Sequence, residues 1–312
     1  MRLGLIDLGS NTVKLALYQV QENRFEQLDF QARFVKILNY ISHGELSEEG
    51  IQRLIAVLLE YRTICQTRQV EQLECFSTAS LRQITNQAQV IARVSRETGI
   101  TIHPISGEQE AYYNLLGMRL TAKEDSFLGQ DLGGGSTQLF TWLDGKPGPS
   151  ESFFLGALKM KQQFVAEDLP TRQEAHAIAQ NAGEVLARAE AFAGLSFSTL
   201  YLMGGSARLL KRLLGADHGT VAASALEALK ERYLDHPEQA RAEILAADPG
   251  RLVTCVPGML VILAVIRQFQ VDTVRISSSS VREGWLLDWM NRQEKMQNNK
   301  ADNKPIIADE IG

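Results

Sequence analysis

Cysteine and histidine are scarce in this sequence of 312 residues, which holds three cysteines and five histidines. Cys65, Cys75 and Cys255 are odd in number, and neither residue type shows the spacing of a metal site. The sequence therefore predicts neither a disulfide framework nor a zinc-type centre. We expect free thiols in a reducing compartment, which places the protein in the cytoplasm.

The chain also lacks an excess of basic residues and a long apolar segment. Its net charge of −5 argues against a general nucleic-acid binder. Asp7 and Asn11 interrupt any apolar stretch near the N-terminus, so no signal peptide is expected. The longest apolar run, residues 252–266, is short for a bilayer and contains Pro257-Gly258. We expect a buried helix behind a turn there, and neither a membrane nor nucleic acid as a partner.

Three common catalytic motifs are missing as well. The sequence contains no Gly-x-x-x-x-Gly-Lys-Ser/Thr loop, no Gly-x-Gly-x-x-Gly and no Gly-x-Ser-x-Gly elbow. A P-loop, a dinucleotide fingerprint and a serine-hydrolase elbow are thereby set aside.

What the chain does contain is one glycine-rich hairpin pattern written twice, at residues 5–15 and 129–139. In both copies an apolar run leads through Asp-Leu-Gly to a small-residue turn and then to alternating apolar residues, which predicts strand, turn and strand. Glycine in such turns lets backbone N–H groups close on an anion. The turn residues that we expect to bind phosphate are Gly9, Ser10, Asn11, Thr12, Gly133, Gly134, Gly135 and Ser136.

An aspartate, Asp7 or Asp131, stands at the end of the first strand of each copy. A carboxylate at this place can hold a hydrated divalent cation or a water molecule. Two such loops facing each other would form a metal-phosphate clamp between two similar domains. The alternative is a plain glycine hairpin in each case, but the repetition in nearly the same register favours a duplicated domain.

The length of the chain also favours two domains. We predict an N-terminal domain at residues 1–123, a C-terminal domain at 124–292 and a polar, disordered tail at 293–312. Both domains are expected to be of the α/β class. Among the predicted elements are helices at 47–66, 86–98, 108–120, 171–192, 207–214, 222–233, 258–269 and 281–291, and a strand at 100–105.

Three further segments carry candidate site residues, each with an ordinary alternative. Arg82 follows a strand end rich in small residues and can grip phosphate in a bidentate manner, or it can be a surface arginine. Glu110 lies in the first turn of a helix, where it can act as a general base or simply favour the helix dipole. At a strand-to-helix turn, backbone N–H groups can bind phosphate or only form the turn, at Gly204, Gly205 and Ser206.

Taken in order, these segments resemble the exopolyphosphatase / guanosine pentaphosphate phosphohydrolase (Ppx/GppA) family, of the superfamily of actin, Hsp70 and sugar kinases. The resemblance spans about residues 1–290. It is carried by residues 6–12, 78–82 with Asn86, 105–107 with Glu110-Ala111, 131–137, 155–157, 204–208, 249–251, 257–258 and 281–284.

The resemblance implies two ribonuclease-H-like domains with the active site in the cleft between them. It implies removal of the terminal phosphate from polyphosphate, or from guanosine pentaphosphate, with Mg²⁺. Glu110 then looks like the water-activating base, and Asp131 like the acidic residue that works with metal and water, with Asp7 as a second metal ligand. Arg82 and the glycine loops look like the phosphate grip. Phosphoryl transfer to water needs positioning, charge neutralisation and an oriented nucleophile.

The sequence departs from the family pattern at three positions. Gln138 stands where the family usually has Glu, Ser278 where it often has a carboxylate, and Gln109 where a Glu-Glu pair is usual. Gln138 keeps hydrogen-bonding capacity toward water or phosphate but carries no charge. The longer members carry extra C-terminal domains; we expect none here, and this expectation favours short chains or a nucleotide as substrate.

Two other functions remain open at this stage. One is a kinase of the same superfamily, which would consume ATP only with an acceptor. The other is a non-catalytic sensor or scaffold that binds guanosine tetraphosphate or pentaphosphate, which the changes at Gln138 and Ser278 motivate. The sequence leaves substrate preference and oligomeric state open, a homodimer included.

Overall fold

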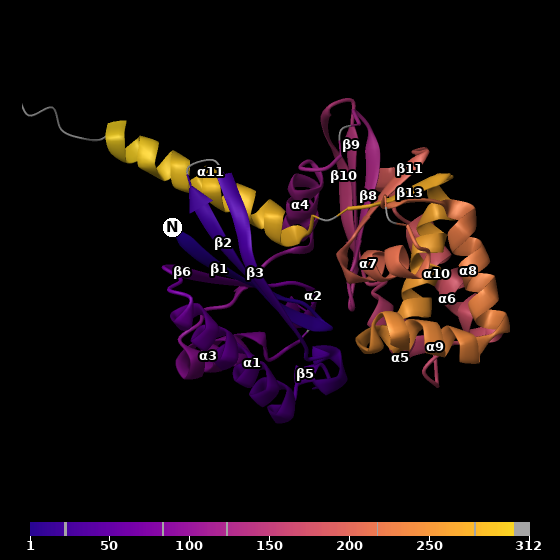
Figure 1. Ribbon diagram of the computed structural model, residues 1–312, viewed down its shortest axis with the longest axis horizontal. Coiled ribbons are helices and arrows are strands. Elements are labelled where there is room, and N and C mark those ends of the chain that lie inside the picture. The colour runs from indigo at the N-terminus through magenta and orange to yellow at the C-terminus, as the bar shows by residue number, and fades with distance from the viewer. Residues whose placement is uncertain (22–23, 83, 123, 217, 278, 303–312) are drawn as a thin grey trace, which may run out of the picture.

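The computed structural model describes residues 1–21, 24–82, 84–122, 124–216, 218–277 and 279–302. Two α/β halves lie side by side, and each is built on one twisted sheet (Figure 1). The first half is drawn in indigo to purple and the second in magenta to orange. The α/β class and the two-domain organisation predicted from the sequence are confirmed.

The first sheet has the strand order β3-β2-β1-β6-β7. Its strand β1 pairs antiparallel with β2 and parallel with β6. The main elements of this half are β1 (Arg2–Leu8), β2 (Thr12–Gln21), β3 (Arg24–Phe34), β6 (Gln72–Ser77), β7 (His103–Pro104), α1 (Glu48–Thr67) and α3 (Gln87–Thr98). Short elements are η1 (Ile37–Tyr40), β4 (Ile41–Ser42), β5 (Glu45–Leu46) and α2 (Ala79–Arg82).

The second sheet has the order β10-β9-β8-β11-β13-β12 and repeats the first. Strand β8 pairs antiparallel with β9 and parallel with β11, just as β1 pairs with β2 and β6. Its strands are β8 (Phe127–Leu132), β9 (Thr137–Leu143), β10 (Lys146–Phe153), β11 (Thr199–Met203), β12 (Thr220–Ala222) and β13 (Thr273–Ile276). The helical segments are α5 (Ala157–Phe164), α6 (Arg172–Ala187), η2 (Glu190–Phe192), α7 (Gly204–Leu213), α8 (Ala223–Asp235), α9 (Pro237–Ala247), η3 (Pro249–Arg251) and α10 (Leu252–Phe269).

Local capping signals in the sequence set several helix ends correctly. Ser47 caps α1, Thr171 and Glu174 form a capping box at the start of α6, and Gly99 ends α3 with φ 69°. The strand predicted at 100–105 was too long, because only the two residues of β7 pair with β6. Helix α9 was not predicted.

Helix α10 begins earlier than predicted and runs through Pro257. Proline removes one helical hydrogen bond, but almost the whole apolar segment is buried in the core of the second half, and this packing outweighs the loss. Within the described residues, only the segment Pro249–Phe269 is long and apolar enough to cross a membrane, and 78% of its most apolar window is buried in the fold.

Helices α4 (Gly107–Met118) and α11 (Val281–Asp302) pack on each other where the two halves meet (Figure 1). Although α11 follows the second sheet in the sequence, it covers one face of the first sheet, where Trp285 stacks on Phe76. Helix α11 continues past residue 291, where the sequence predicted its end, to Asp302, and the disordered tail stays a prediction. Residues 303–312 lie outside the described residues.

Candidate active site

The two predicted hairpins form the same turn in both halves. Leu8 pairs with Val13, and Leu132 pairs with Thr137. In each turn the first glycine donates its backbone N–H to a carbonyl three residues later, at 3.2 Å from Gly9 to Thr12 and at 2.9 Å from Gly133 to Ser136. The predicted repeat is therefore present in the structure, and the two turns share the same strand pairing and the same backbone hydrogen bond.

The two turns lie against each other. A Cβ atom at Gly135 would lie 2.7 Å from Ser10 Oγ, and one at Gly134 would lie 3.3 Å from the backbone nitrogen of Asn11. A third segment closes on the second turn, since a Cβ at Gly156 would lie 2.2 Å from the Gly134 carbonyl oxygen. Glycine is needed here because three backbones approach each other closely.

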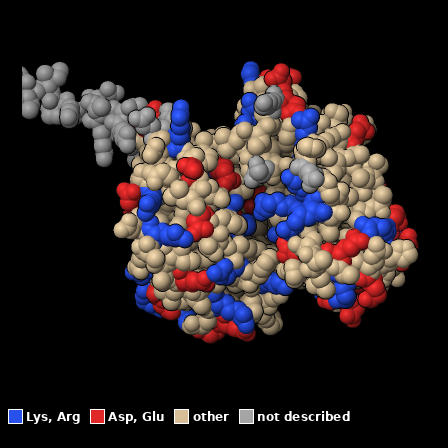
Figure 2. Space-filling model, viewed as in Figure 1, with Lys and Arg blue, Asp and Glu red and all other residues tan. Residues whose placement is uncertain are grey.

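Between these turns lies a cleft with an empty volume of about 680 Å³, open solvent at its mouth included. It is visible as the hollow between the halves in Figure 2, with Lys and Arg atoms beside it. The cleft brings together most of the predicted site residues. It is lined by Asp7, Gly9, Ser10, Asn11, Thr12, Lys14, Thr78, Glu110, Asp131, Leu132, Gly133, Gly134, Gly135, Ser136, Ala157, Gly204, Gly205, Ser206, Arg251, Thr254 and Val281.

Glu110 enters the cleft from the first turn of α4. Ser106 and Gln109 form a capping box that fixes this helix start, and Glu110 is 5% exposed. Burial raises the pKa of the Glu110 carboxyl to about 7, against the opposing effect of Arg82, and the charges of Asp131 and Asp7 raise it further. A carboxylate with this pKa can accept a proton at neutral pH.

Arg82 lies behind Glu110 and does not line the cleft. Its Nη1 donates to Glu110 Oε2 at 2.8 Å and to the Ile105 carbonyl at 2.9 Å. Its Nη2 is buried and has no hydrogen-bond partner among the described residues. The structure thus places Arg82 as a partner of Glu110, and the predicted bidentate grip on phosphate stays a prediction.

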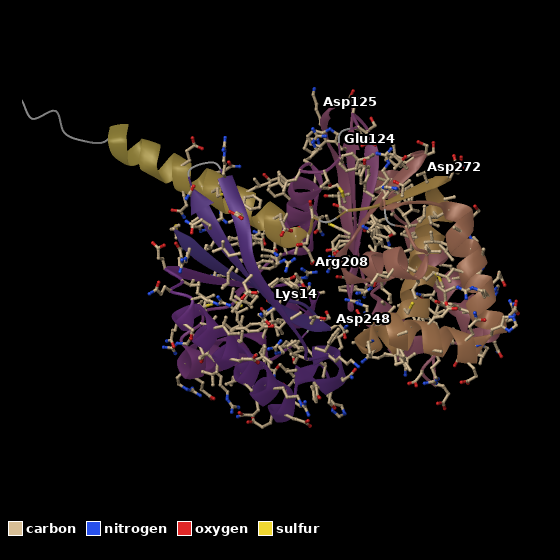
Figure 3. All side chains as sticks on the ribbon, in the orientation of Figure 1. Lys14, Glu124, Asp125, Arg208, Asp248 and Asp272 are labelled. Carbon is tan, nitrogen blue, oxygen red and sulfur yellow. The ribbon has the colours of Figure 1, made fainter. Side chains whose placement is uncertain are left out.

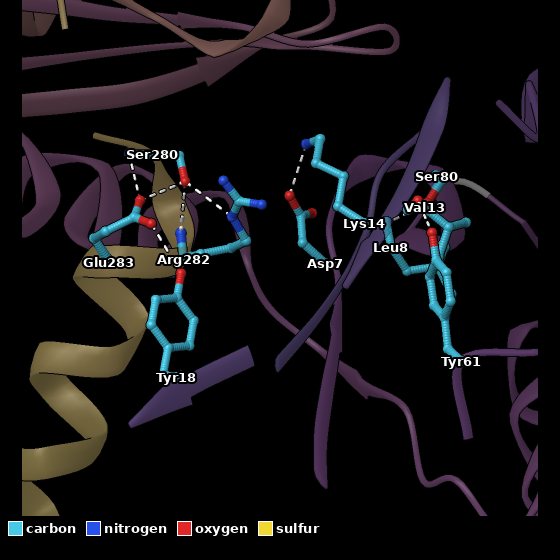
Figure 4. A network of polar contacts seen from close by, with 10 residues as sticks. All are labelled: Asp7, Leu8, Val13, Lys14, Tyr18, Tyr61, Ser80, Ser280, Arg282 and Glu283. Atoms are coloured by element: carbon cyan, nitrogen blue, oxygen red, sulfur yellow. Dashed lines mark hydrogen bonds and ion pairs between the residues drawn. The ribbon is translucent and has the colours of Figure 1, made fainter. Parts of the chain in front are cut away.

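The two aspartates at the strand ends have different partners. Lys14 Nζ lies 2.7 Å from Asp7 Oδ2, and Figure 4 shows the ammonium directed at the carboxylate. Gln138 stands opposite Asp131, at the position that Lys14 holds opposite Asp7. Burial raises the pKa of the Asp131 carboxyl, while the Lys14 charge lowers it.

Gln138 itself does not line the cleft. It is 1% exposed, and its Nε2 donates to Ser136 Oγ at 2.8 Å and to Ser152 Oγ at 3.0 Å. Gln138 therefore reaches the cleft through Ser136. Ser278, another of the departures noted in the sequence, lies outside the described residues.

Sequence reasoning missed three cations around the cleft: Lys14, Arg208 and Arg251. Lys14 comes from the first half and Arg208 from the second, and Figure 3 draws both near the junction of the halves. Arg251 covers Gly205, where a Cβ would lie 1.7 Å from its Nη2. Burial lowers the pKa of both arginines. The sequence did contain a signal for Lys14, because the predicted hairpin places it opposite Asp7 on the neighbouring strand.

The donor set of the cleft fits Mg²⁺ together with a phosphate. Asp7, Glu110 and Asp131 supply carboxylate oxygens to one space. Across the part of the chain that the structure describes, no group of three His, Cys, Asp or Glu could hold a metal by itself. Mg²⁺ in phosphate-handling proteins is commonly bound by one or two carboxylates with substrate oxygens and water.

Known proteins are similar to this chain in sequence and in fold. Exopolyphosphatase 1 of Mycobacterium tuberculosis is 26% identical over 309 residues, which covers 92% of this chain and 88% of the relative. The crystal structure of an exopolyphosphatase from Cytophaga hutchinsonii has a TM-score of 0.84 at 21% identity, covering 93% of this chain and 98% of that one. That of the Aquifex aeolicus Ppx/GppA family member has a TM-score of 0.77 at 22% identity, covering 94% and 98%.

These two structures confirm the fold that the sequence resemblance implied. A sequence model of the Ppx/GppA phosphatase family matches residues 17–293, which is most of the chain. The chain therefore belongs to the Ppx/GppA phosphatase family.

Proposed function

We propose that this protein hydrolyses the terminal phosphoanhydride bond of inorganic polyphosphate. The observation that carries the proposal is the position of Glu110, a buried carboxylate with a pKa of about 7 beside two facing glycine turns. The Glu110 carboxylate can accept a proton from water while the two turns hold the phosphate that the water attacks. The similarity to the exopolyphosphatase of Mycobacterium tuberculosis supports this substrate.

The backbone of the cleft supplies the phosphate site. N–H groups of the two turns and of the first turn of α7, at Gly204–Ser206, surround the same space. Lys14 and Arg251 add positive charge for the remaining phosphates of a chain. Glu110 takes the proton of the attacking water, and Arg82 holds the Glu110 carboxylate in place.

Mg²⁺ belongs to this proposal as a cofactor. Asp131 would hold it, with Asp7 as a second ligand if Lys14 releases that carboxylate. A bound Mg²⁺ would neutralise charge on the phosphate oxygens during transfer.

The finer substrate assignment stays part of the proposal. Guanosine pentaphosphate presents the same terminal phosphoanhydride, and a short polyphosphate is the other substrate that the sequence favours. We expect the protein to act in the cytoplasm, and a homodimer stays a prediction. A non-catalytic binder of guanosine tetraphosphate or pentaphosphate is the alternative. The pKa of about 7 at the Glu110 carboxyl favours catalysis instead.

The test is phosphate release from short polyphosphate, long polyphosphate and guanosine pentaphosphate, measured side by side while Mg²⁺ is titrated. Release from at least one polyphosphate supports the proposal. Release from guanosine pentaphosphate alone would show that the nucleotide, and not polyphosphate, is the substrate. Tight binding of guanosine tetraphosphate without any release would identify a sensor, and ATP consumption that needs an acceptor would identify a kinase.

A further inference from the structure

Arg282, the second residue of α11, has a buried guanidinium without a carboxylate partner. The residue is 5% exposed, it forms no ion pair with any residue that the structure describes, and its Nη1 has no hydrogen-bond partner there. The neighbouring Glu283 is engaged elsewhere, since it accepts from Ser280 N–H at 2.7 Å, from Ser280 Oγ at 2.6 Å and from the Tyr18 hydroxyl at 2.9 Å. A buried cation without a partner is costly, so this site is suited to an anion that supplies one.

Two contacts fix the orientation of this guanidinium. Arg282 Nε donates to Ser280 Oγ at 3.1 Å, and Arg282 Cζ lies 4.7 Å from the centre of the Phe30 ring. The aromatic contact offsets part of the cost of burying the charge. Because Nε is the only guanidinium nitrogen that donates to a described residue, the two Nη groups are left to form a bidentate pair with one phosphate.

The strand pairing places this guanidinium beside the cleft. Phe30 of β3 pairs with Ala16 of β2, and Lys14 lies two residues from Ala16 on the same face of that strand. Lys14 lines the cleft, and so does Val281, the residue that precedes Arg282. Figure 4 shows the Nη end of Arg282 directed to the side on which Lys14 lies. Arg282 and Lys14 therefore approach the edge of the cleft from the same face of the first sheet.

We propose that Arg282 binds a phosphate group of the substrate through its Nη1 and Nη2. The assignment rests on the proposed function, because the anion is then a phosphate of a polyphosphate chain or of guanosine pentaphosphate. A bidentate grip was predicted from the sequence for Arg82, whose Nη1 donates to Glu110 instead. The phosphate that Arg282 holds lies on the side of the cleft that Lys14 lines.

The test is the binding of inorganic tripolyphosphate, measured by calorimetry in the Glu110→Gln background, in which we expect turnover to be slow. Arg282→Met keeps an unbranched stem that can pack on Phe30 but removes the charge. We expect Kd to rise about 10- to 100-fold, because hydrogen bonds to charged groups are strong. The melting temperature of the free protein should stay the same or rise, because a buried charge without a partner is removed.

Two further variants complete the series. Arg282→Lys keeps the charge but loses the two-pronged geometry, so its Kd should lie between those of Arg282 and Arg282→Met. The matched control is Arg292→Lys on the same helix. Arg292 Cζ also lies over an aromatic ring, 5.9 Å from the centre of Trp285, but Arg292 is exposed and pairs with Asp288 at 3.1 Å. This control should leave the Kd for tripolyphosphate unchanged.

An unchanged Kd in Arg282→Met would overturn this inference, and an unchanged Kd with a lower melting temperature would identify a structural role. If the Arg282 variants fold poorly, a crystal structure of Glu110→Gln with tripolyphosphate decides. A phosphate oxygen within hydrogen-bonding distance of Nη1 or Nη2 supports the inference, and bound tripolyphosphate without that contact, or no binding at all, overturns it. If tripolyphosphate binds through Arg282 but the wild-type protein releases no phosphate from any substrate, only the proposed function fails.

Discussion

Lys14 and Asp7 form a cross-strand ion pair of 2.7 Å in the first repeat, and the equivalent pair in the second repeat is Gln138 and Asp131. The two aspartates therefore differ although their backbones match. Asp7 pairs with the Lys14 ammonium, whereas the residue opposite Asp131 carries an uncharged amide that donates to Ser136 and Ser152. The first repeat therefore places a cation at the cross-strand position of its aspartate, and the second repeat places a neutral residue there.

Glu110→Gln is expected to lower kcat by about a hundredfold to ten-thousandfold, because the side chain keeps its shape but can no longer accept a proton. KM should change little, since the glycine turns that we propose bind phosphate are untouched. Phosphate-release kinetics provide the measurement. The control is Glu108→Gln in the same helix turn, an exposed position expected to be silent. Near-normal turnover in Glu110→Gln would remove the general-base role.

The activity of the wild-type enzyme should rise with pH and level off above about 7, because the base must be ionised and burial raises the pKa of Glu110 to about 7. The positive charge of Arg82 lowers the pKa of Glu110 and so opposes the effect of burial. Arg82→Ala should therefore move the ascending limb of kcat/KM to higher pH, and Arg82→Lys should leave it closer to the wild-type position. A higher KM with an unmoved limb would instead support the direct phosphate contact predicted from the sequence.

Gln138→Glu should lower the Mg²⁺ concentration needed for half-maximal activity and speed phosphate release. The substitution places a carboxylate opposite Asp131, where the serines at 136 and 152 can donate to it. Mg²⁺ titrations of activity provide the measurement, with Gln89→Glu at an exposed position of α3 as the control. An unchanged half-saturation and rate would show that this position is silent.

Gly156→Ala is expected to abolish activity. The new Cβ would lie 2.2 Å from the Gly134 carbonyl oxygen and would displace the second glycine turn, residues 133–136. Backbone atoms cannot move aside as a flexible side chain does. The matched control is Gly183→Ala inside α6, where nothing lies within 4 Å. That variant should keep full activity and gain up to about 1 kcal/mol of stability. Full activity in Gly156→Ala would contradict the close packing of the turns.

Local sequence signals determined much of this protein. The repeated Asp-Leu-Gly turns, the caps at Ser47 and Thr171 and the Gly99 stop depend on residues within a few positions of each other. Short-range backbone sterics and hydrogen bonding suffice to specify them. Glu110 and Asp131 could be identified as cleft residues because matching motifs carried them, and their roles stay predictions.

The tertiary structure alone decided what each of these groups contacts. The pairing of Arg82 with Glu110 joins residues 28 positions apart, and α11 reaches back across the chain to cover the first sheet. Helix α10 passes through Pro257 because burial of a whole apolar segment outweighs one lost hydrogen bond. Contacts between segments far apart in sequence depend on packing, and the partners and dielectric environment of a buried polar group have no local signature in the chain.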